Sequence, residues 1–170
     1  GRFKVLLIGE TIIDQYIFGE VLGKSGKEPH LVLNEEKKAT YLGGAAAIAN
    51  HLATFCKSVK FLTLAGKEKE YLRFIKKLLR KKVSLKVFNK KNIQTIIKKR
   101  FIDDVTKNKL LGVYSINDQV IKKNVEKQLI ENIKKESKNC DLILVSDYGH
   151  GLISEKTARY INNSKIFFSL

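Results

Sequence analysis

The chain has 170 residues, of which 44% are hydrophobic, 29% are charged and only one is proline, a composition that excludes disorder and collagen-like structure and fits one folded domain. Its formal net charge of +16 comes from 33 Lys and Arg residues against 17 Asp and Glu, which allows binding to a nucleic acid or another anionic polymer. Only five of the 33 are Arg and the lysines are spread along the chain, so we attribute the charge mainly to AT-rich codon usage and do not expect a nucleic-acid partner.

The first half of the chain predicts alternating strands and helices. Short apolar or alternating runs predict strands at residues 3–8, 15–21, 30–34, 60–65 and 85–88. Gly9 closes the first of these runs, the Gly-, Ser- and Pro-containing residues 22–29 predict a loop, and the charged residues 35–38 predict a turn. Apolar residues at helical spacing predict one helix that starts at Gly43 and Gly44 and a second at 71–79.

The second half continues this alternation. Residues 95–102 and 109–116, joined by a polar stretch, predict a hairpin, and the apolar run 141–145 predicts a strand of a covered parallel sheet. Asn117 or Asp118 is expected to cap a helix that ends near 138, and Ser154 a helix that ends near 162. A last strand is expected at 165–170. The pattern predicts an α/β fold with a doubly wound, mostly parallel sheet and a small extra sheet, and because the sequence stops within a strand we expect it to be incomplete at the C-terminus.

Cellular location and metal content follow from what the sequence lacks. No apolar run approaches the length of a membrane span, and the first residues show no secretory signal. Cys56 and Cys140 are far apart, which fits a reducing cytosol, so we expect a cytoplasmic protein with no membrane partner. His30, His51 and His150 are scattered, so we predict no metal site.

Two clusters of candidate site residues occur in the first 50 residues, near the ends of predicted elements, where α/β proteins place their sites. Glu10 and Asp14 follow the first predicted strand and either hydrogen-bond to substrate hydroxyls or serve only as turn and cap residues. Gly43 and Gly44 either let a ligand approach the backbone amides of a helix start or allow close helix packing.

Two further clusters occur in the second half. Lys98 and Arg100 are two residues apart in a predicted strand, so they share a face and make either an anion site or a solvated surface. The other cluster follows the strand at 141–145. It contains Asp147, which could orient a substrate or a metal-bound water, and the further candidates Ser146, Tyr148 and His150. His150 lies between two glycines, which indicate a tight backbone, and acts either in acid–base chemistry or as a bystander.

The four clusters, in this order, resemble the ribokinase-like (PfkB) carbohydrate kinases, and most closely their heptose-phosphate kinase branch. The Gly-Asp-x-x-x-Asp-x-Tyr pattern of that branch is matched by Gly9, Glu10, Asp14 and Tyr16. Its Gly-Gly-Ala-Ala helix start is matched by residues 43–46, its Thr-Lys-x-Arg strand in part by Lys98 and Arg100, and its Ser-Asp-Tyr-x-x-Gly turn by Ser146, Asp147, Tyr148 and Gly151. The resemblance spans essentially the whole chain.

The resemblance implies that strands at about 15–21, 30–34, 95–102 and 109–116 form a β lid that often also forms a homodimer contact. It implies phosphoryl transfer from Mg-ATP to a sugar or sugar phosphate, with a heptose phosphate of lipopolysaccharide biosynthesis as the best match. Asp14 and the backbone of residues 43–44 would hold sugar hydroxyls, and Lys98 and Arg100 would face the sugar's phosphate. The catalytic base and most of the ATP site are expected beyond Leu170, so this chain alone is expected to be inactive and to bind neither ATP nor Mg²⁺.

The sequence also departs from the family's pattern. Glu10 stands for the first Asp, Ala47 for an Asn, Gly112 and Tyr114 for an Arg and an Asp, and His150 for a Lys. Because Ala47 and Gly112 remove expected polar contacts, a non-catalytic sugar-phosphate-binding module is the alternative to a kinase. By analogy with the family, a nucleotidyltransferase domain could follow in the complete polypeptide.

Overall fold

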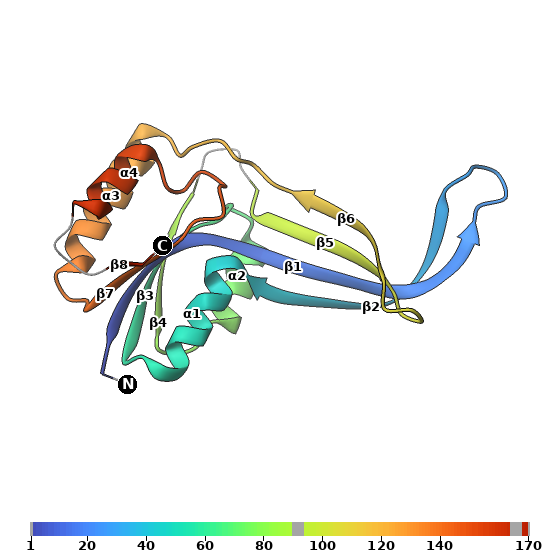
Figure 1. Ribbon diagram of the computed structural model, residues 1–170, viewed down its shortest axis with the longest axis horizontal. Helices are drawn as coiled ribbons and strands as arrows, with labels where there is room; N and C mark the ends of the chain where they lie inside the picture. Colours follow the sequence, from blue (N-terminus) through green and yellow to red (C-terminus); the bar gives the residue numbers. More distant parts are fainter. Residues whose placement is uncertain (1, 90–93, 164–167, 170) are drawn as a thin grey trace.

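A sheet covered by helices and a long β extension make up the molecule, which the computed structural model describes for residues 2–89, 94–163 and 168–169 (Figure 1). Strand β1 (Lys4–Lys24) runs through both parts. Residues 5–13 are buried without interruption, residues 14–19 alternate between half-buried and buried, and residues 20–24 alternate between exposed and half-buried. That change marks the passage from a sheet covered on both faces to one that is partly open.

The body is built on a parallel sheet in the order β4–β3–β1–β7–β8. Its other strands are β3 (Ser58–Leu64), β4 (Val83–Phe88), β7 (Leu142–Ser146) and β8 (Phe168–Ser169). Parallel strands need long crossover connections. Here the connections contain α1 (Gly44–Phe55), α2 (Lys69–Leu78), α3 (Lys123–Ser137) and α4 (Glu155–Asn162). This architecture confirms the predicted α/β fold with a mostly parallel sheet.

Alternate residues of β1 enter different cores. Val5 and Leu7 pack in a cluster with the alanines of α1, whereas Leu6 and Ile8 pack in a cluster with apolar residues of α3 and α4. A third cluster joins Ile13 of β1 to α2 and β5. Successive strand residues point to opposite faces, so odd-numbered residues in this part of β1 face α1 and α2, and even-numbered residues face the other side.

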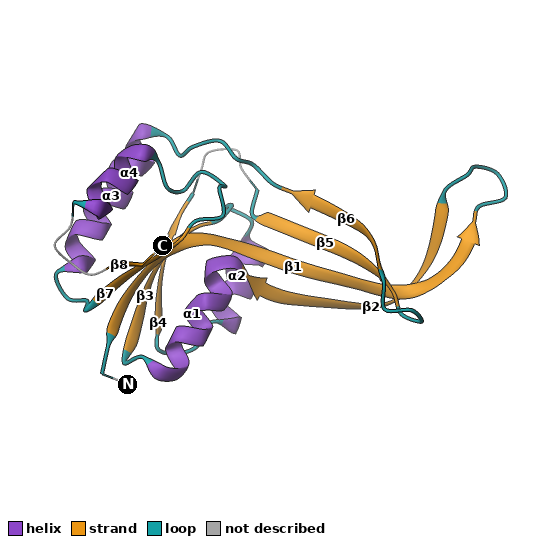
Figure 2. Cartoon of the chain, in the orientation of Figure 1, coloured by secondary structure: helices purple, strands orange, loops and turns teal. Residues whose placement is uncertain are grey.

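The extension is a four-stranded sheet in the order β2–β1–β5–β6. It adds β2 (Leu31–Gly43), β5 (Ile96–Asp103) and β6 (Lys109–Ser115) to the outer half of β1. Figure 2 shows that the extension consists of strands and loops, whereas the helices belong to the body. The predicted hairpin is confirmed, because β5 and β6 pair antiparallel.

Two predictions about the first strands were wrong. Residues 3–8 and 15–21 belong to one continuous strand, because Gly9 does not end it. A Cβ atom at Gly9 would lie 2.3 Å from the carbonyl oxygen of Ser146 and 2.7 Å from the Cβ of Ala45, so this glycine permits close packing of β1. The charged residues 35–38 lie inside β2 and not in a turn. Among the residues that the structure describes, β2 pairs with β1 alone, so it is an edge strand. An exposed edge strand accommodates charged side chains.

Later predictions had mixed outcomes. Ser154 caps α4 as expected, and its hydroxyl oxygen accepts a hydrogen bond from the Thr157 amide at 3.1 Å. The caps predicted at Asn117 and Asp118 were wrong, because α3 begins at Lys123. Asn117 instead accepts from the Gln119 amide at 3.0 Å, a local turn contact that competes with helix formation. Of the strand expected at 165–170, residues 168–169 form β8 and the others lie outside the described residues.

Candidate functional site

Asp14 and Arg100 form the centre of a polar cluster on one face of the extension. In the parallel pairing of β1 and β5, Asp14 lies opposite Lys98 and Tyr16 opposite Arg100, so all four side chains share a face. Arg100 Nη1 donates to Asp14 Oδ1 at 2.5 Å, and each of the two side chains is about one-fifth exposed. The hydrogen bond to Asp14 is the main cause that raises the pKa of Arg100. The pair therefore holds a charged guanidinium against a partly buried carboxylate.

Three tyrosines surround these cations. The guanidinium carbon of Arg100 lies 5.4 Å from the centre of the Tyr16 ring and 5.6 Å from that of Tyr114. Lys98 Nζ lies 5.7 Å from the centre of the Tyr114 ring, and Tyr41 meets Tyr16 edge to face at 5.9 Å. These distances are typical of cation–π and aromatic contacts. We call this set the cation–aromatic face: Asp14, Tyr16, Tyr41, Lys98, Arg100 and Tyr114.

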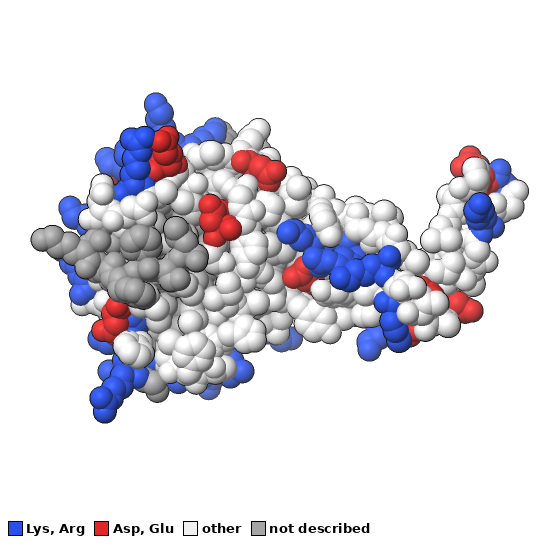
Figure 3. All heavy atoms as spheres, viewed as in Figure 1, with Lys and Arg blue, Asp and Glu red and all other residues white. Residues whose placement is uncertain are grey.

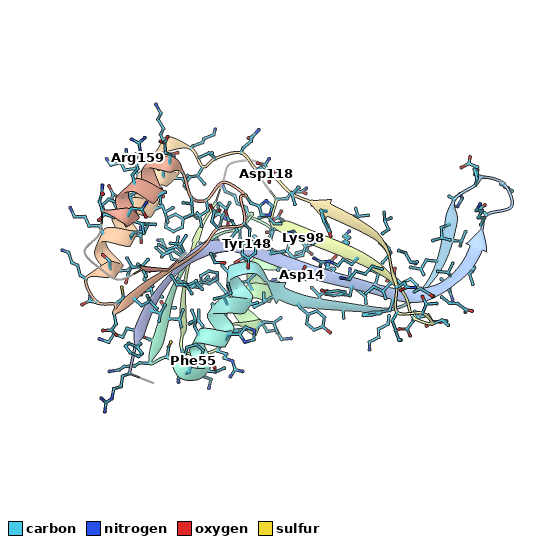
Figure 4. All side chains as sticks on the ribbon, viewed as in Figure 1. Asp14, Phe55, Lys98, Asp118, Tyr148 and Arg159 are labelled. Carbon is cyan, nitrogen blue, oxygen red and sulfur yellow. The ribbon has the colours of Figure 1, made fainter. Side chains whose placement is uncertain are left out.

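The cation–aromatic face lies where the extension joins the body. Figure 4 shows Asp14 and Lys98 together at this junction, with Tyr148 on the side of the body. Figure 3 shows a blue patch over the extension with red carboxylate atoms beside it. Sequence reasoning had not assigned the tyrosines to the site. Tyr16 was recognisable from its two-residue spacing to Asp14, but the positions of Tyr41 and Tyr114 depend on strand register.

The paired glycines hold the start of α1 against β1. A Cβ atom at Gly43 would lie 2.0 Å from Asp14 Oδ2, so this glycine makes room for the carboxylate. Gly44 has a φ of +56°, and a Cβ atom there would lie 2.6 Å from the Glu10 carbonyl oxygen. These contacts fit the alternative of close helix packing, because the approaching groups come from β1 itself, and the approach of a ligand to these glycines stays a prediction.

Glu10 is a structural carboxylate. Its side chain is fully buried, and it accepts hydrogen bonds from the amides of Tyr148 at 3.0 Å and Leu152 at 3.2 Å. Each carboxylate oxygen takes one of these bonds. These contacts fit the alternative of a turn residue, because the side chain is enclosed and holds the turn after β7 against β1; a contact of Glu10 with a substrate stays a prediction.

That turn has the tight backbone expected from its glycines. Gly149 and Gly151 have φ values of +74° and +82°, and Asp147 Oδ1 accepts from the Gly149 amide at 2.9 Å. Ser146 ends β7 opposite Gly9, and the side chain of Tyr148 is 42% exposed. Asp147, Tyr148 and Gly149 are thus exposed members of this turn, whereas Ser146 belongs to the sheet.

His150 braces the same turn from the other side. Its side chain is buried, and Nδ1 lies 2.8 Å from Oδ1 of Asp118 in the segment before α3. Because this contact joins two loops, the structure gives His150 a bracing role. Its part in proton transfer stays a prediction.

The structure thus divides the sequence-predicted residues into two groups on one side of β1. Asp14, Gly43, Lys98 and Arg100 come together, with Gly44 next to them at the start of α1. Glu10 holds the second group, which contains Ser146, Asp147, Tyr148 and His150. Glu10 and Asp14 are four positions apart in the sequence, and a strand rises about 3.3 Å per residue, so their backbones are about 13 Å apart along β1.

Metal-ligating side chains and thiols are described over residues 2–89 and 94–163. Within these ranges, no three His, Cys, Asp or Glu side chains gather closely enough to hold a metal ion. None of the helices described is long and apolar enough to cross a membrane. Cys56 and Cys140 are free thiols, and burial raises the pKa of both.

Sequence relatives were found among curated proteins, although no family model matches the chain. It is 31% identical over 163 residues to the bifunctional protein HldE of Aliarcobacter butzleri, an alignment that covers 94% of this chain and 33% of that protein. It is 27% identical to HldE of Campylobacter curvus, with 95% and 34% covered. The chain therefore spans about one-third of the length of these relatives.

Solved structures share the fold. A protein described as a possible 1-phosphofructokinase from Thermotoga maritima superposes with a TM-score of 0.68 at 15% identity, over 97% of this chain and 52% of that one. The ribokinase of Arabidopsis thaliana, solved with ribose and ATP, gives a TM-score of 0.59 at 16% identity, over 85% and 45%. Sequence and fold thus agree: the chain is similar in sequence to one part of the bifunctional HldE proteins and shares the fold of ribokinase and a related carbohydrate kinase.

Proposed function

We propose that this chain is the sugar-binding part of a carbohydrate kinase that transfers the γ-phosphoryl group of ATP to a hydroxyl of a sugar phosphate. The observation that carries the proposal is the placement of Asp14 beside Lys98 and Arg100, next to the start of α1. A carboxylate accepts hydrogen bonds from sugar hydroxyls, and paired cations neutralise a phosphate. One face thus offers both kinds of group that a sugar phosphate needs.

Within the proposal, the aromatic rings keep the cations in place. Arg100 uses one of its five donors on Asp14, and the rings of Tyr16 and Tyr114 flank its guanidinium. A cation with restricted rotamers loses less entropy when it binds a phosphate. Phosphoryl transfer depends mainly on positioning and charge neutralisation, which is the work we assign to this face.

We propose a heptose phosphate as the substrate, in the synthesis of a surface polysaccharide such as lipopolysaccharide. Similarity to the HldE proteins supports this choice. The cations at 98 and 100 support a phosphorylated sugar over a neutral one.

The nucleotide is assigned to another part of the complete polypeptide. The start of α1 does not suit ATP, because Asp14 fills the approach at Gly43 and its charge opposes a phosphate. We propose that ATP, Mg²⁺ and the catalytic base are held by sequence outside this chain, which spans about one-third of its HldE relatives. Bound Mg-ATP would supply the transferable phosphoryl group, while residues of this chain would orient the accepting sugar. This chain alone is then expected to be inactive.

The extension is proposed to act as a lid and as the contact of a homodimer. Its exposed apolar side chains support a partner surface, and they include Leu22, Leu31, Leu111 and Val113. The two free thiols fit a cytoplasmic protein.

The test is sugar-dependent ATP consumption by the complete polypeptide, with heptose phosphates and a panel of other sugar phosphates. Asp14→Asn is expected to lower kcat/KM about 100-fold, because it replaces one acceptor oxygen by a donor and removes the charge that pairs with Arg100, so the sugar hydroxyls lose their position. Arg100→Lys is expected to raise KM for the phosphorylated sugar, because a single ammonium cannot replace the planar donors. Glu36→Gln, an exposed change on β2, is the matched control and is expected to leave both constants unchanged.

Two other outcomes contradict the proposal in different ways. Binding of a sugar phosphate without ATP turnover would make the protein a non-catalytic binding module. Absence of both binding and turnover for every sugar phosphate would remove the assignment of this face to sugars.

A further inference from the structure

A cavity lies on the opposite side of the extension from the cation–aromatic face. It measures about 390 Å³, within the range of small-molecule sites. Strands β1 and β2 form one wall with Gln15, Lys38 and Thr40, and α2 forms the other with Glu70, Tyr71 and Phe74. Gln15 follows Asp14 directly in β1, so the two side chains point to opposite faces of the sheet. The cavity is therefore separate from the site proposed above.

Gln15 is the unusual member of this cavity. Its side chain is 95% buried (5% exposed), yet the amide oxygen Oε1 has no hydrogen-bond partner in the structure. Buried polar atoms of proteins are nearly always hydrogen-bonded, because an unmade bond costs stability. Gln15 lines the cavity, but its Oε1 atom is closed to solvent, so a donor from solution reaches this acceptor only when the side chain turns toward the cavity.

The rest of the lining defines the chemistry of that donor. Lys38 and Glu70 have opposite charges, so the cavity offers no net charge to attract an anion or a cation. Thr40 and Tyr71 add hydroxyls, and the rings of Tyr71 and Phe74 offer an apolar surface. Amide, carboxylate, ammonium and hydroxyl groups beside aromatic rings suit a molecule that carries many hydroxyls on a compact carbon skeleton.

We propose that this cavity binds a neutral polyhydroxylated molecule of about monosaccharide size, a sugar or a polyol, and that the Gln15 side chain turns toward it so that one hydroxyl donates to Oε1. Such a ligand would contact the extension through β1 and β2 and the body through α2. It would therefore couple the position of the extension to occupancy of the cavity. The proposal does not depend on the kinase assignment, because it involves another face and an uncharged ligand.

The test is saturation-transfer difference NMR on the complete polypeptide, with D-glucose, D-mannose, D-ribose and mannitol as separate probes. The measurement is made in an Asp14→Asn background, so that the cation–aromatic face does not contribute to the signal. At least one probe is expected to receive saturation. Comparison of the three sugars with mannitol distinguishes a ring sugar from an open-chain polyol.

Variants of the lining assign the signal to this cavity. Gln15→Leu is expected to weaken probe binding by about tenfold or more, since it removes the acceptor. The same change is expected to raise the Tm by roughly 2–4 °C, because an unpaired buried oxygen is lost. Gln128→Leu, the same substitution on the exposed surface of α3, is expected to change neither quantity. Glu70→Ala alters an exposed wall residue without touching the core and is expected to weaken the same probe, whereas Glu131→Ala on α3 is not.

Two results would overturn the proposal. If no probe receives saturation, the cavity holds only water. If a probe receives saturation equally in the wild type, the Gln15→Leu protein and the Glu70→Ala protein, it binds elsewhere. Neither result affects the kinase proposal, which is tested by ATP turnover and by the Asp14 and Arg100 variants.

Discussion

Single glycine positions decide where the carboxylate of the cation–aromatic face can lie. Gly43 has an ordinary extended backbone with a φ of −119°, so its conformation does not require glycine. The requirement is steric, because Asp14 Oδ2 occupies the space of a side chain. Gly44 differs, since its positive φ disfavours any other residue. Adjacent glycines in one motif thus serve two physical purposes.

Gly43→Ala is expected to push the Asp14 carboxylate away from Arg100 and to lower the free energy of unfolding by about 1–3 kcal/mol through overpacking. The sugar KM of the complete protein should rise together with this loss. Urea denaturation and steady-state kinetics measure the two effects. Gly26→Ala, which has open space around its Cβ position, is the matched control and should stay within about 0.5 kcal/mol of the wild type. Equal stability of both variants would show that Asp14 can shift without cost.

At the scale of elements, the β5–β6 hairpin has an anchored turn. Asp103 ends β5, and its Oδ2 accepts hydrogen bonds from the Thr106 amide at 3.0 Å and the Thr106 hydroxyl at 2.5 Å. These hydrogen bonds lower the pKa of Asp103. The Asp104 amide donates to the Gly19 carbonyl oxygen at 2.7 Å, which ties the same turn to β1. The turn therefore fixes the register that carries Lys98 and Arg100.

Asp103 should make the stability of the extension depend on pH. Its folded-state pKa is lowered, so its contribution is present above the unfolded-state value of about 3.9 and is lost as the pH falls through the lower folded-state value. Asp103→Asn is expected to lower the urea midpoint near neutral pH and to converge with the wild type in acid. Asp104→Asn, which loses only an exposed ion pair with Lys107, should change the midpoint little. A constant difference between Asp103→Asn and the wild type at every pH would contradict this role for the carboxylate.

At the scale of the whole molecule, β1 connects every part of the fold. It pairs with β3 and β7 in the body and with β2 and β5 in the extension. Glu10 adds two long-range contacts. It accepts hydrogen bonds from the amides of Tyr148 and Leu152, which are 138 and 142 positions away in the sequence. The basic residues are not gathered in one place. On the face shown in Figure 3, they occur on the body and along the extension and form no single stripe.

Glu10→Leu is expected to leave the amides of Tyr148 and Leu152 without an acceptor, at a cost of about 1–3 kcal/mol for each. Hydrogen exchange at these two amides should speed up, together with a fall in the free energy of unfolding. Glu10→Gln keeps one acceptor oxygen and should restore protection of one amide more than the other. Unchanged exchange in Glu10→Leu would show that the turn holds its place without this carboxylate.

The sequence by itself determined the features that depend on neighbouring residues. Apolar periodicity predicted the parallel α/β fold, a hydroxyl before an amphipathic run predicted the Ser154 cap, and two alternating runs predicted the β5–β6 hairpin. The ordered motifs also pointed to the family. Each of these signals is local, so it can be recognised without knowing which strands pair.

Only the tertiary structure decided the features that depend on distant residues in register. The 86 positions between Asp14 and Arg100 are bridged only because β1 and β5 pair in parallel at one register. The same pairing sets the ring of Tyr16 against Arg100, and the pairing of β5 with β6 brings in the ring of Tyr114. Likewise, Glu10 is buried by its contacts with a distant turn, and Gly9 is tightly packed within a strand that continues past it. A shift of one residue would send each side chain to the other face, and no local pattern in the sequence records that choice.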